Sequence, residues 1–245
     1  RAVRIAVEAL QNAGHEVVEF EPPNVERMIQ IFFRLVGADA CQTVVDSLNG
    51  DKREAGVRQL LAVYSVPNWV KALVSRILRM IGQNAAAGLL ASSRGSTVHE
   101  LWQLQHERSG LNAEFLDKLH AERFDFVIAP ANAHPAIPHG SFGDISFAAC
   151  YTMLYNVLDY TVGSLPVCTV DKDLDKLTGW PEKGSENYMI HALKTGKSLL
   201  DAAVSMHYDA SKAHGLPVGV QVVTGKFKEE ETLEYMRILE DAIQK

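Results

Sequence analysis

The sequence predicts an α/β fold of one unit, in which helices alternate with short strands. The chain opens on a helical pattern that Gly14 ends, and the alternation over residues 15–20 then predicts a strand. Short apolar runs bounded by turn residues predict three further strands, over residues 124–130, 165–170 and 216–223. The order of helix, glycine and strand at the start, together with these later strands, is typical of the α/β class.

The helices between the strands are expected from the spacing of apolar residues. One helix is predicted over residues 25–48, and the turn residues 49–51 end it. Thr97 and Glu100 fit a capping box, which opens a long helix. Later helices are expected over residues 150–160, 198–206 and 229–244, and the rest of 171–213 is expected to be irregular. No repeat or linker divides the chain into domains.

Composition and charge exclude several classes of protein. The 245 residues are 47% hydrophobic and 22% charged, which is ordinary for a globular protein. The net charge of -6 argues against a nucleic-acid partner. No apolar run reaches the roughly 18 residues that a spanning helix needs. The three cysteines form no CxxC pair, so a reducing compartment is expected.

The start of the chain is unusual, because Arg1 stands where a methionine is expected and no capping residue precedes the first helix. We therefore expect this chain to be a fragment of a longer protein.

Residues 68–81 form the sharpest amphipathic pattern in the chain. One side of the predicted helix is apolar and carries Trp69, Val70, Leu73, Val74, Ile77, Leu78, Met80 and Ile81. The other side carries Asn68, Lys71, Ser75, Arg76 and Arg79, with no acid. An apolar side with a tryptophan at its edge, opposed by a basic side, is typical of a helix that lies in a membrane interface. The helix is about 20 Å long, so it can lie on a bilayer but not cross it. The alternative is an ordinary surface helix packed on its own core.

Five segments, in order along the chain, carry a resemblance to a known family. They are the opening helix and strand around residues 13–15, then 67–71, 100–107, 124–130 and 215–221, and the run 150–167 carries the same resemblance. These segments resemble the C-terminal half of the amidase signature family, and are most similar to its fatty acid amide hydrolase branch. The resemblance implies the C-terminal portion of the amidase-signature fold, a mixed twisted β-sheet covered by α-helices. Residues 1–245 would then be part of a single amidase domain, with 60–95 as a membrane-cap and substrate-access segment.

The resemblance implies an amide hydrolase with a Ser-Ser-Lys mechanism, whose catalytic residues are expected upstream of Arg1. No catalytic residue is expected in this chain, so the chain alone is expected to be inactive. Ser92 and Ser93 lack the flanking glycines of an oxyanion loop, and Ser141 near His134 lies in no nucleophile elbow. Both serine groups are therefore interpreted as loop residues.

Substrate and membrane residues are likewise implied by the resemblance. The acyl channel would be lined by Val36, Leu60, Leu89, Ala149, Met153 and Phe227, each of which could instead be plain core packing. Membrane contact would fall to Trp69, Val70, Leu73, Ile77, Met80 and Ile81, with a second interfacial helix over residues 85–90. The charge pair of the family's membrane portal falls near Gln59 and Ala85, which carry no charge.

The remaining polar residues are given structural roles. Within 150–160, the polar side chains Tyr151, Thr152, Tyr155, Asn156 and Asp159 are expected to hold a helix against the sheet. His99 with His106, and His207 with His214, lie seven residues apart, so each pair would share a helix face. Two ligands two turns apart cannot chelate one ion unaided, so no metal or other cofactor is expected.

The main functional hypothesis is a membrane-associated hydrolase of fatty acid amides or similar lipid amides and esters, of which this chain is the C-terminal half. Its expected partners are a lipid amide substrate, a membrane surface, the missing N-terminal catalytic half and a second copy in a homodimer, with no nucleic acid. The expected location is intracellular, with peripheral or monotopic association at the cytoplasmic face of endomembranes. Two alternatives stay open: a truncated, non-catalytic lipid- or membrane-binding protein, and a soluble amidase for small amides.

Overall fold

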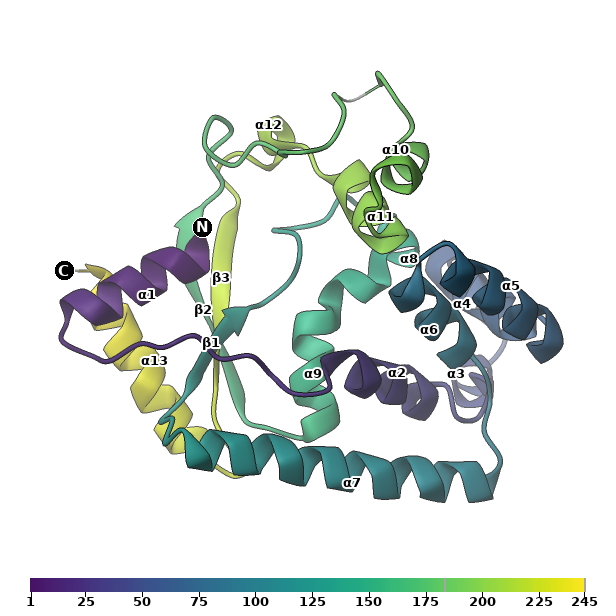
Figure 1. Ribbon diagram of the computed structural model, residues 1–245, viewed down its shortest axis with the longest axis horizontal. Helices are drawn as coiled ribbons and strands as arrows, with labels where there is room; N and C mark the ends of the chain where they lie inside the picture. The colour runs from purple at the N-terminus through teal and green to yellow at the C-terminus, as the bar shows by residue number, and fades with distance from the viewer. Residues whose placement is uncertain (183, 245) are drawn as a thin grey trace.

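The computed structural model describes residues 1–182 and 184–244. A small sheet lies on one side of the molecule and a group of helices on the other, with α7 (Val98–Ala121) running along both (Figure 1). The strands are β1 (Val127–Pro130), β2 (Val162–Thr169) and β3 (Pro217–Val223). The other elements are α1 (Ala2–Asn12), α2 (Val25–Val36), α3 (Gln42–Ser47), α4 (Ala55–Ser65), α5 (Asn68–Met80), α6 (Asn84–Ser92), α8 (Phe142–Ile145), a 3-10 turn η1 (Ser146–Ala149), α9 (Cys150–Leu158), α10 (Tyr188–Thr195), α11 (Leu199–His207), α12 (Ala210–Ala213) and α13 (Glu229–Gln244). The predicted α/β class is confirmed.

The sheet is antiparallel, with strand order β1-β3-β2. The central strand β3 alternates, so that Val220 and Val222 face α1 and α13 while Val223 faces the core on the other side. Gly219 allows β2 to approach, because a Cβ there would lie 2.7 Å from the Leu165 carbonyl oxygen. Pro166 is tolerated opposite Gly219 because β2 is an edge strand, and the register shifts between Pro166 and Cys168.

One hydrophobic core lies between the sheet and the pair α1 and α13, and a second lies between the sheet and the other helices. Phe115 of α7 is fully buried there, with its ring edge-on to Phe20 at 5.5 Å, to Tyr160 at 5.6 Å and to Tyr155 at 6.4 Å. Leu104, on the same side of α7, belongs to this core as well. The predicted spacing of apolar residues on the long helix is therefore confirmed.

Two predicted elements are wrong. Residues 15–20 form no strand; Val17 and Phe20 pack on the two cores, but no described strand pairs with this segment. The helix predicted over 25–48 is two helices, α2 and α3. The break follows Gly37, because Ala40 and Cys41 adopt positive φ values of 55° and 64°, which a continuous helix cannot accommodate.

The region 171–213 holds more helix than predicted. The helix expected over 198–206 is confirmed as α11, but α10 and α12 were not expected. Each is preceded by a capping residue whose side chain accepts backbone N–H bonds, Asn187 for α10 and Asp209 for α12. These capping residues were the signal in the sequence that marked both helices.

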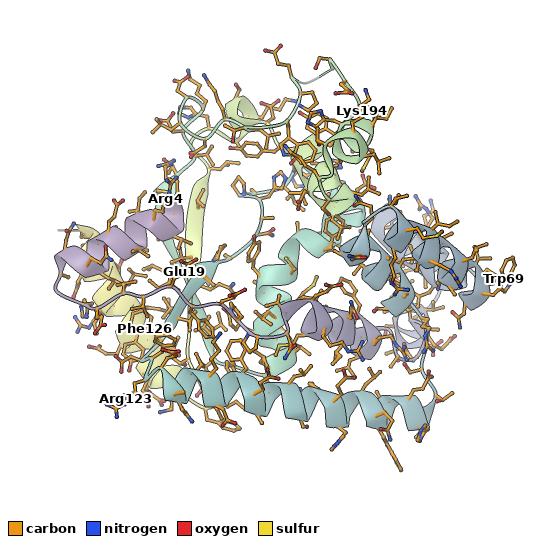
Figure 2. All side chains as sticks on the ribbon, viewed as in Figure 1. Arg4, Glu19, Trp69, Arg123, Phe126 and Lys194 are labelled. Carbon is orange, nitrogen blue, oxygen red and sulfur yellow. The ribbon has the colours of Figure 1, made fainter. Side chains whose placement is uncertain are left out.

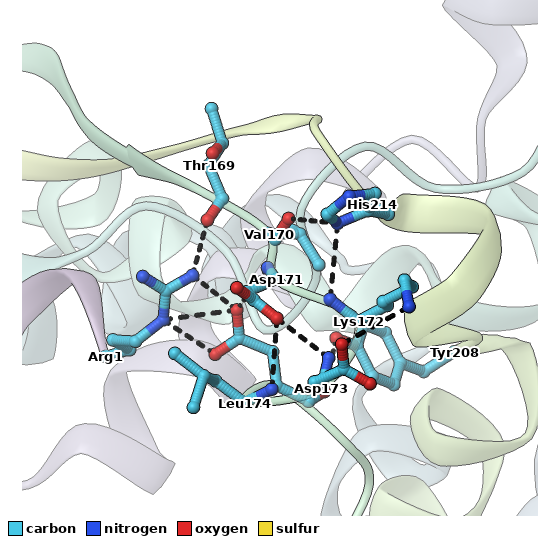
Figure 3. A network of polar contacts seen from close by, with 10 residues as sticks. Arg1, Thr169, Val170, Asp171, Lys172, Asp173, Leu174, Tyr208 and His214 are labelled. Atoms are coloured by element: carbon cyan, nitrogen blue, oxygen red, sulfur yellow. Dashed lines mark hydrogen bonds and ion pairs between the residues drawn. The ribbon is translucent and has the colours of Figure 1, made fainter.

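A polar network anchors this region to α1 (Figure 3). Arg1 Nε donates to Asp175 Oδ1 at 2.8 Å, and the Arg1 guanidinium also donates to the Thr169 carbonyl. Asp171 Oδ1 accepts from the backbone N–H of Asp173, and Tyr208 Oη donates to the Asp175 carbonyl. The hydrogen bond from Arg1 lowers the pKa of Asp175 to about 2. These hydrogen bonds fix the position of the polar loop that follows β2.

The capping box at the start of α7 predicts that part of the stability of the fold is lost at acidic pH. Thr97 N–H donates to Glu100 Oε2 at 2.9 Å, and Arg94 Nη2 donates to Glu100 Oε1 at 2.7 Å. These bonds lower the pKa of Glu100 from its ordinary value of 4.5 to about 2. A carboxyl with a lowered pKa stabilises the fold above about pH 4.5, and this contribution is lost as the pH falls through about 2.

Replacement of Glu100 by Gln is therefore expected to lower the melting temperature at pH 6. The decrease of the melting temperature from pH 6 to pH 3 should then be smaller in the variant than in the wild type. Thermal melts at both pH values would measure this. Glu8→Gln, at an exposed position of α1, is the matched control and should keep the wild-type drop. A Glu100→Gln variant with the wild-type drop would contradict the assignment.

Candidate functional site

Helix α5 turns its apolar side outward. Trp69 and Met80 are 71% and 72% exposed, and Leu73, Ile77 and Ile81 are exposed as well. Figure 2 shows Trp69 at the outer end of this helix, pointing away from the body of the molecule. Of the six residues predicted to contact a membrane, only Val70 is half-buried.

The exposed apolar side chains continue from α4 into α5. We call this set the cap surface; it comprises Leu60, Val63, Val66, Trp69, Leu73, Val74, Ile77, Met80 and Ile81. Arg76 and Arg79 are also exposed on α5. Within the part of the chain that the structure describes, every helix is too short or too polar to cross a bilayer.

The basic side predicted for α5 is divided in the structure. Lys71 and Ser75 are buried, whereas Arg76 and Arg79 face solvent. The prediction that all polar residues of this helix lie on a solvated side is therefore wrong for Lys71 and Ser75. Helix α6, expected as a second interfacial helix, packs on α2 and α5 and buries Ala87 and Gly88.

The six residues predicted for the acyl channel lie on separate elements of the fold. Val36, Leu89 and Met153 lie on α2, α6 and α9, and α2 packs against both of the other helices. Met153 is buried, Leu89 is half-buried and Val36 is exposed. Ala149 is half-buried one turn before Met153, and Leu60 is exposed on α4.

Phe227 stands apart from the other five. It is 88% exposed and adopts a positive φ of 57° in the loop after β3. Its neighbour Lys226 places Nζ 3.1 Å from Asp159 Oδ2, beyond the C-terminal end of α9. Met153 lies nearer the opposite end of that helix.

The hollows of the described part of the chain include one of about 580 Å³ and one of about 410 Å³. The first is a shallow surface between Glu21 and Gln30. The second lies where α7, the sheet and the start of α13 meet, and Tyr160 and Tyr235 line it. None of the six predicted channel residues lines either hollow.

Helix α9 is held by residues that the sequence did not indicate. Gln221 Nε2 donates to the Pro130 carbonyl at 2.7 Å and to the Tyr151 carbonyl at 3.3 Å. From α7, Arg108 donates to the Val157 carbonyl and Asn112 to the Leu158 carbonyl. These three side chains bind backbone carbonyls, so no pattern in α9 itself marks them.

The polar side chains of α9 therefore have a smaller role than predicted. Tyr155 is buried in the core, and its burial raises its pKa to about 12. Thr152 Oγ1 donates to the Ala149 carbonyl of its own turn. Tyr151 and Asn156 are exposed, so the expectation that they hold the helix against the sheet is wrong for these two. Asp159 is exposed as well, but it pairs with Lys226, which follows β3.

The interpretation as a loop residue is wrong for Ser92, which is the last residue of α6, whereas Ser93 and Ser141 lie at helix ends and bond to nearby backbone. Ser93 Oγ donates to the Leu89 carbonyl, and Ser141 Oγ donates to the Pro138 carbonyl at 2.6 Å. His134 places Nε2 2.7 Å from the Val204 carbonyl, and its burial lowers its pKa. Ser141 and His134 are thus each engaged with other groups.

The two histidine pairs differ in where the structure places them. His99 and His106 both lie on α7, but His207 ends α11 and His214 follows α12, so the shared helix face predicted for the second pair is wrong. Over residues 1–182 and 184–244, no three His, Cys, Asp or Glu side chains are placed to hold a metal ion.

Comparison with known proteins gives a consistent set of relatives. The model of the family described as Amidase matches residues 1–233. Fatty acid amide hydrolase 1 of Caenorhabditis elegans is 30% identical over 99% of this chain and 40% of its own length. Fatty-acid amide hydrolase 1 of Sus scrofa is 28% identical over 98% of this chain and 39% of its own.

Other relatives are named for a smaller substrate. An acetamidase of Emericella nidulans is 26% identical over 95% of this chain and 36% of its own length. A solved structure of a fatty acid amide hydrolase superposes with a TM-score of 0.72 and 21% identity, over 99% of this chain and 36% of that chain. The chain thus spans 36–40% of the length of these relatives.

Proposed function

Because the chain belongs to the amidase family, we propose that it is part of a hydrolase that cleaves fatty acid amides or similar lipid amides and esters. Two of the relatives named above are fatty acid amide hydrolases, and each is matched over nearly the whole of this chain. Since the chain spans only 36–40% of its relatives, we place the Ser-Ser-Lys catalytic residues in a preceding half. This chain would contribute substrate binding and membrane contact.

The observation that carries the lipid substrate is the cap surface. Burying an exposed Leu or Ile side chain in an apolar medium contributes about 1.5–3 kcal/mol, so several such side chains favour contact with a bilayer. Arg76 and Arg79 at its border would attract anionic lipid head groups. A helix of 13 residues is about 20 Å long and would lie along the interface.

The proposal assigns a location and partners. Contact through one helical surface corresponds to peripheral or monotopic association, which we place at the cytoplasmic face of endomembranes. The partners would be the membrane, a lipid amide, the preceding catalytic half and a second copy of the protein in a homodimer.

Within this proposal, Met153 and Leu89 are the strongest candidates for contact with the acyl chain. They lie on α9 and α6, which both pack on α2, and α6 also contacts α5, the main helix of the cap surface. A flexible thioether such as Met153 adapts well to a chain of variable shape. Val36, Leu60, Ala149 and Phe227 remain in the proposed set by their positions in the family pattern.

Labelling with a fluorophosphonate probe tests the division of labour. The full-length protein should be labelled, and the 245-residue chain should not, because losing nucleophile and base together lowers the rate about 10⁶-fold. Labelling of this chain alone would contradict the placement of catalysis elsewhere. A full-length protein that binds vesicles and stays unlabelled would instead favour the non-catalytic lipid-binding alternative.

A second candidate function is the hydrolysis of small amides by a soluble enzyme. The acetamidase relatives favour it, since they match 95% of this chain at 26% identity. In that case the cap surface would contact protein rather than lipid.

A further inference from the structure

Helix α5 buries two polar residues while most of its apolar side chains are exposed, which is unusual for a surface helix. Lys71 is 2% exposed and Ser75 is 1% exposed, although both are polar. Leu73, Val74 and Ile77 are exposed, whereas Val70 and Leu78 are half-buried. A short helix on a protein surface would ordinarily roll to bury its apolar side, so some interaction must hold α5 in the observed orientation.

The ammonium group of Lys71 is held by backbone carbonyls. Its Nζ donates to the Ser93 carbonyl at 2.6 Å and contacts the Tyr64 carbonyl at 3.4 Å. Ser93 is the C-terminal capping residue of α6, and Tyr64 lies in the last turn of α4. Carbonyls at a helix C-terminus have no partner within the helix and carry a partial negative charge. One lysine therefore binds the C-terminal ends of two helices.

The backbone carbonyls are the main partners of the buried Lys71 ammonium group. In the described residues, no acidic side chain pairs with it, and its burial lowers its pKa. Its Nζ also lies 5.5 Å from the centre of the Tyr64 ring. Tyr64 in turn bonds through its hydroxyl to the Phe33 carbonyl of α2. The position of α5 is thus connected through Lys71 to α4, α6 and α2.

Ser75 does not share this role. It lies one turn after Lys71 on the same buried side, and its Oγ has no hydrogen-bond partner within the described residues. A buried hydroxyl without a partner opposes this orientation rather than stabilising it. Ser75 is therefore the matched control for Lys71, with the same helix side and equal burial.

We infer that Lys71 is the positioning residue that holds the apolar side of α5 outward, by joining the C-terminal ends of α4 and α6. The inference rests on the proposed membrane contact for its functional consequence, but its structural part can be measured without a membrane. Loss of the ammonium leaves both helix ends unpaired and frees α5 to roll inward.

The test compares wild type, Lys71→Met and Ser75→Ala in the full-length protein. Lys71→Met keeps a linear side chain and removes the charge. Amide hydrogen exchange over residues 68–80 should become at least tenfold faster in Lys71→Met, with α7 unchanged, and should stay at the wild-type rate in Ser75→Ala. Co-sedimentation with vesicles of phosphatidylcholine and phosphatidylserine should weaken at least tenfold in Lys71→Met alone.

Each outcome separates the two ideas. Unchanged exchange in Lys71→Met overturns the positioning role, whatever the vesicles show. Faster exchange together with wild-type vesicle binding also overturns it, because the outward orientation would not depend on Lys71. Faster exchange in Lys71→Met, with no vesicle binding by the wild type, supports the positioning role and instead overturns the proposed membrane contact.

Discussion

Replacing Phe115 by Ala is expected to lower the free energy of unfolding by about 3–5 kcal/mol. The ring is fully buried and meets Phe20, Tyr155 and Tyr160 edge-on, so it joins α7 to α9 and to the extended segment before α2. Its removal leaves a cavity that three separate segments would have to close. Urea unfolding, followed by circular dichroism, would measure the change.

Trp102→Ala is the matched control, since Trp102 is an aromatic residue of the same helix that is 70% exposed. Its free energy of unfolding should change by no more than about 0.5 kcal/mol. A Phe115→Ala variant that loses less than about 1 kcal/mol would contradict the assignment of Phe115 to the centre of this core.

The second large effect concerns the cap surface. Ile77→Glu is expected to weaken vesicle binding by the full-length protein about tenfold to a hundredfold. Burial of an Ile side chain contributes about 1.5–3 kcal/mol, and each 1.4 kcal/mol changes a dissociation constant tenfold. Co-sedimentation with vesicles that contain phosphatidylserine would measure the affinity. Trp69→Ala should weaken binding in the same direction.

Leu193→Glu on α10 is the control for this prediction, because Leu193 is 50% exposed and Ile77 is 46% exposed. A charge placed at Leu193 should leave the affinity for vesicles unchanged. If both variants weaken binding equally, the effect is one of charge on the whole protein, and the cap surface has no special role.

The helical pattern of α5 was predictable from the sequence, but its orientation was not. Periodicity determines which residues share a side, and the apolar set from Trp69 to Ile81 is exposed almost as predicted. Which side faces the protein depends on the carbonyls of Tyr64 and Ser93, which belong to other helices. A pattern within one helix carries no information about such contacts.

The same limit explains the errors around α9 and the sheet. The bounds of α9 follow from its local sequence, whereas its attachment depends on Gln221, which lies 70 residues after Tyr151. Residues 15–20 alternate as a strand does, yet a strand forms only where another strand offers hydrogen bonds. The acyl-channel residues were expected from family resemblance, since no local pattern brings α2, α6 and α9 together.

A ratio of kcat/KM values tests most directly the proposal that this chain equips an amidase for a lipid substrate. The full-length protein would be assayed with the primary amide of an 18-carbon fatty acid and with acetamide. We expect a preference of at least about a hundredfold for the long-chain amide, since each buried CH₂ contributes about 0.8 kcal/mol. Equal values, or a preference for acetamide, would contradict it and favour a hydrolase of small amides.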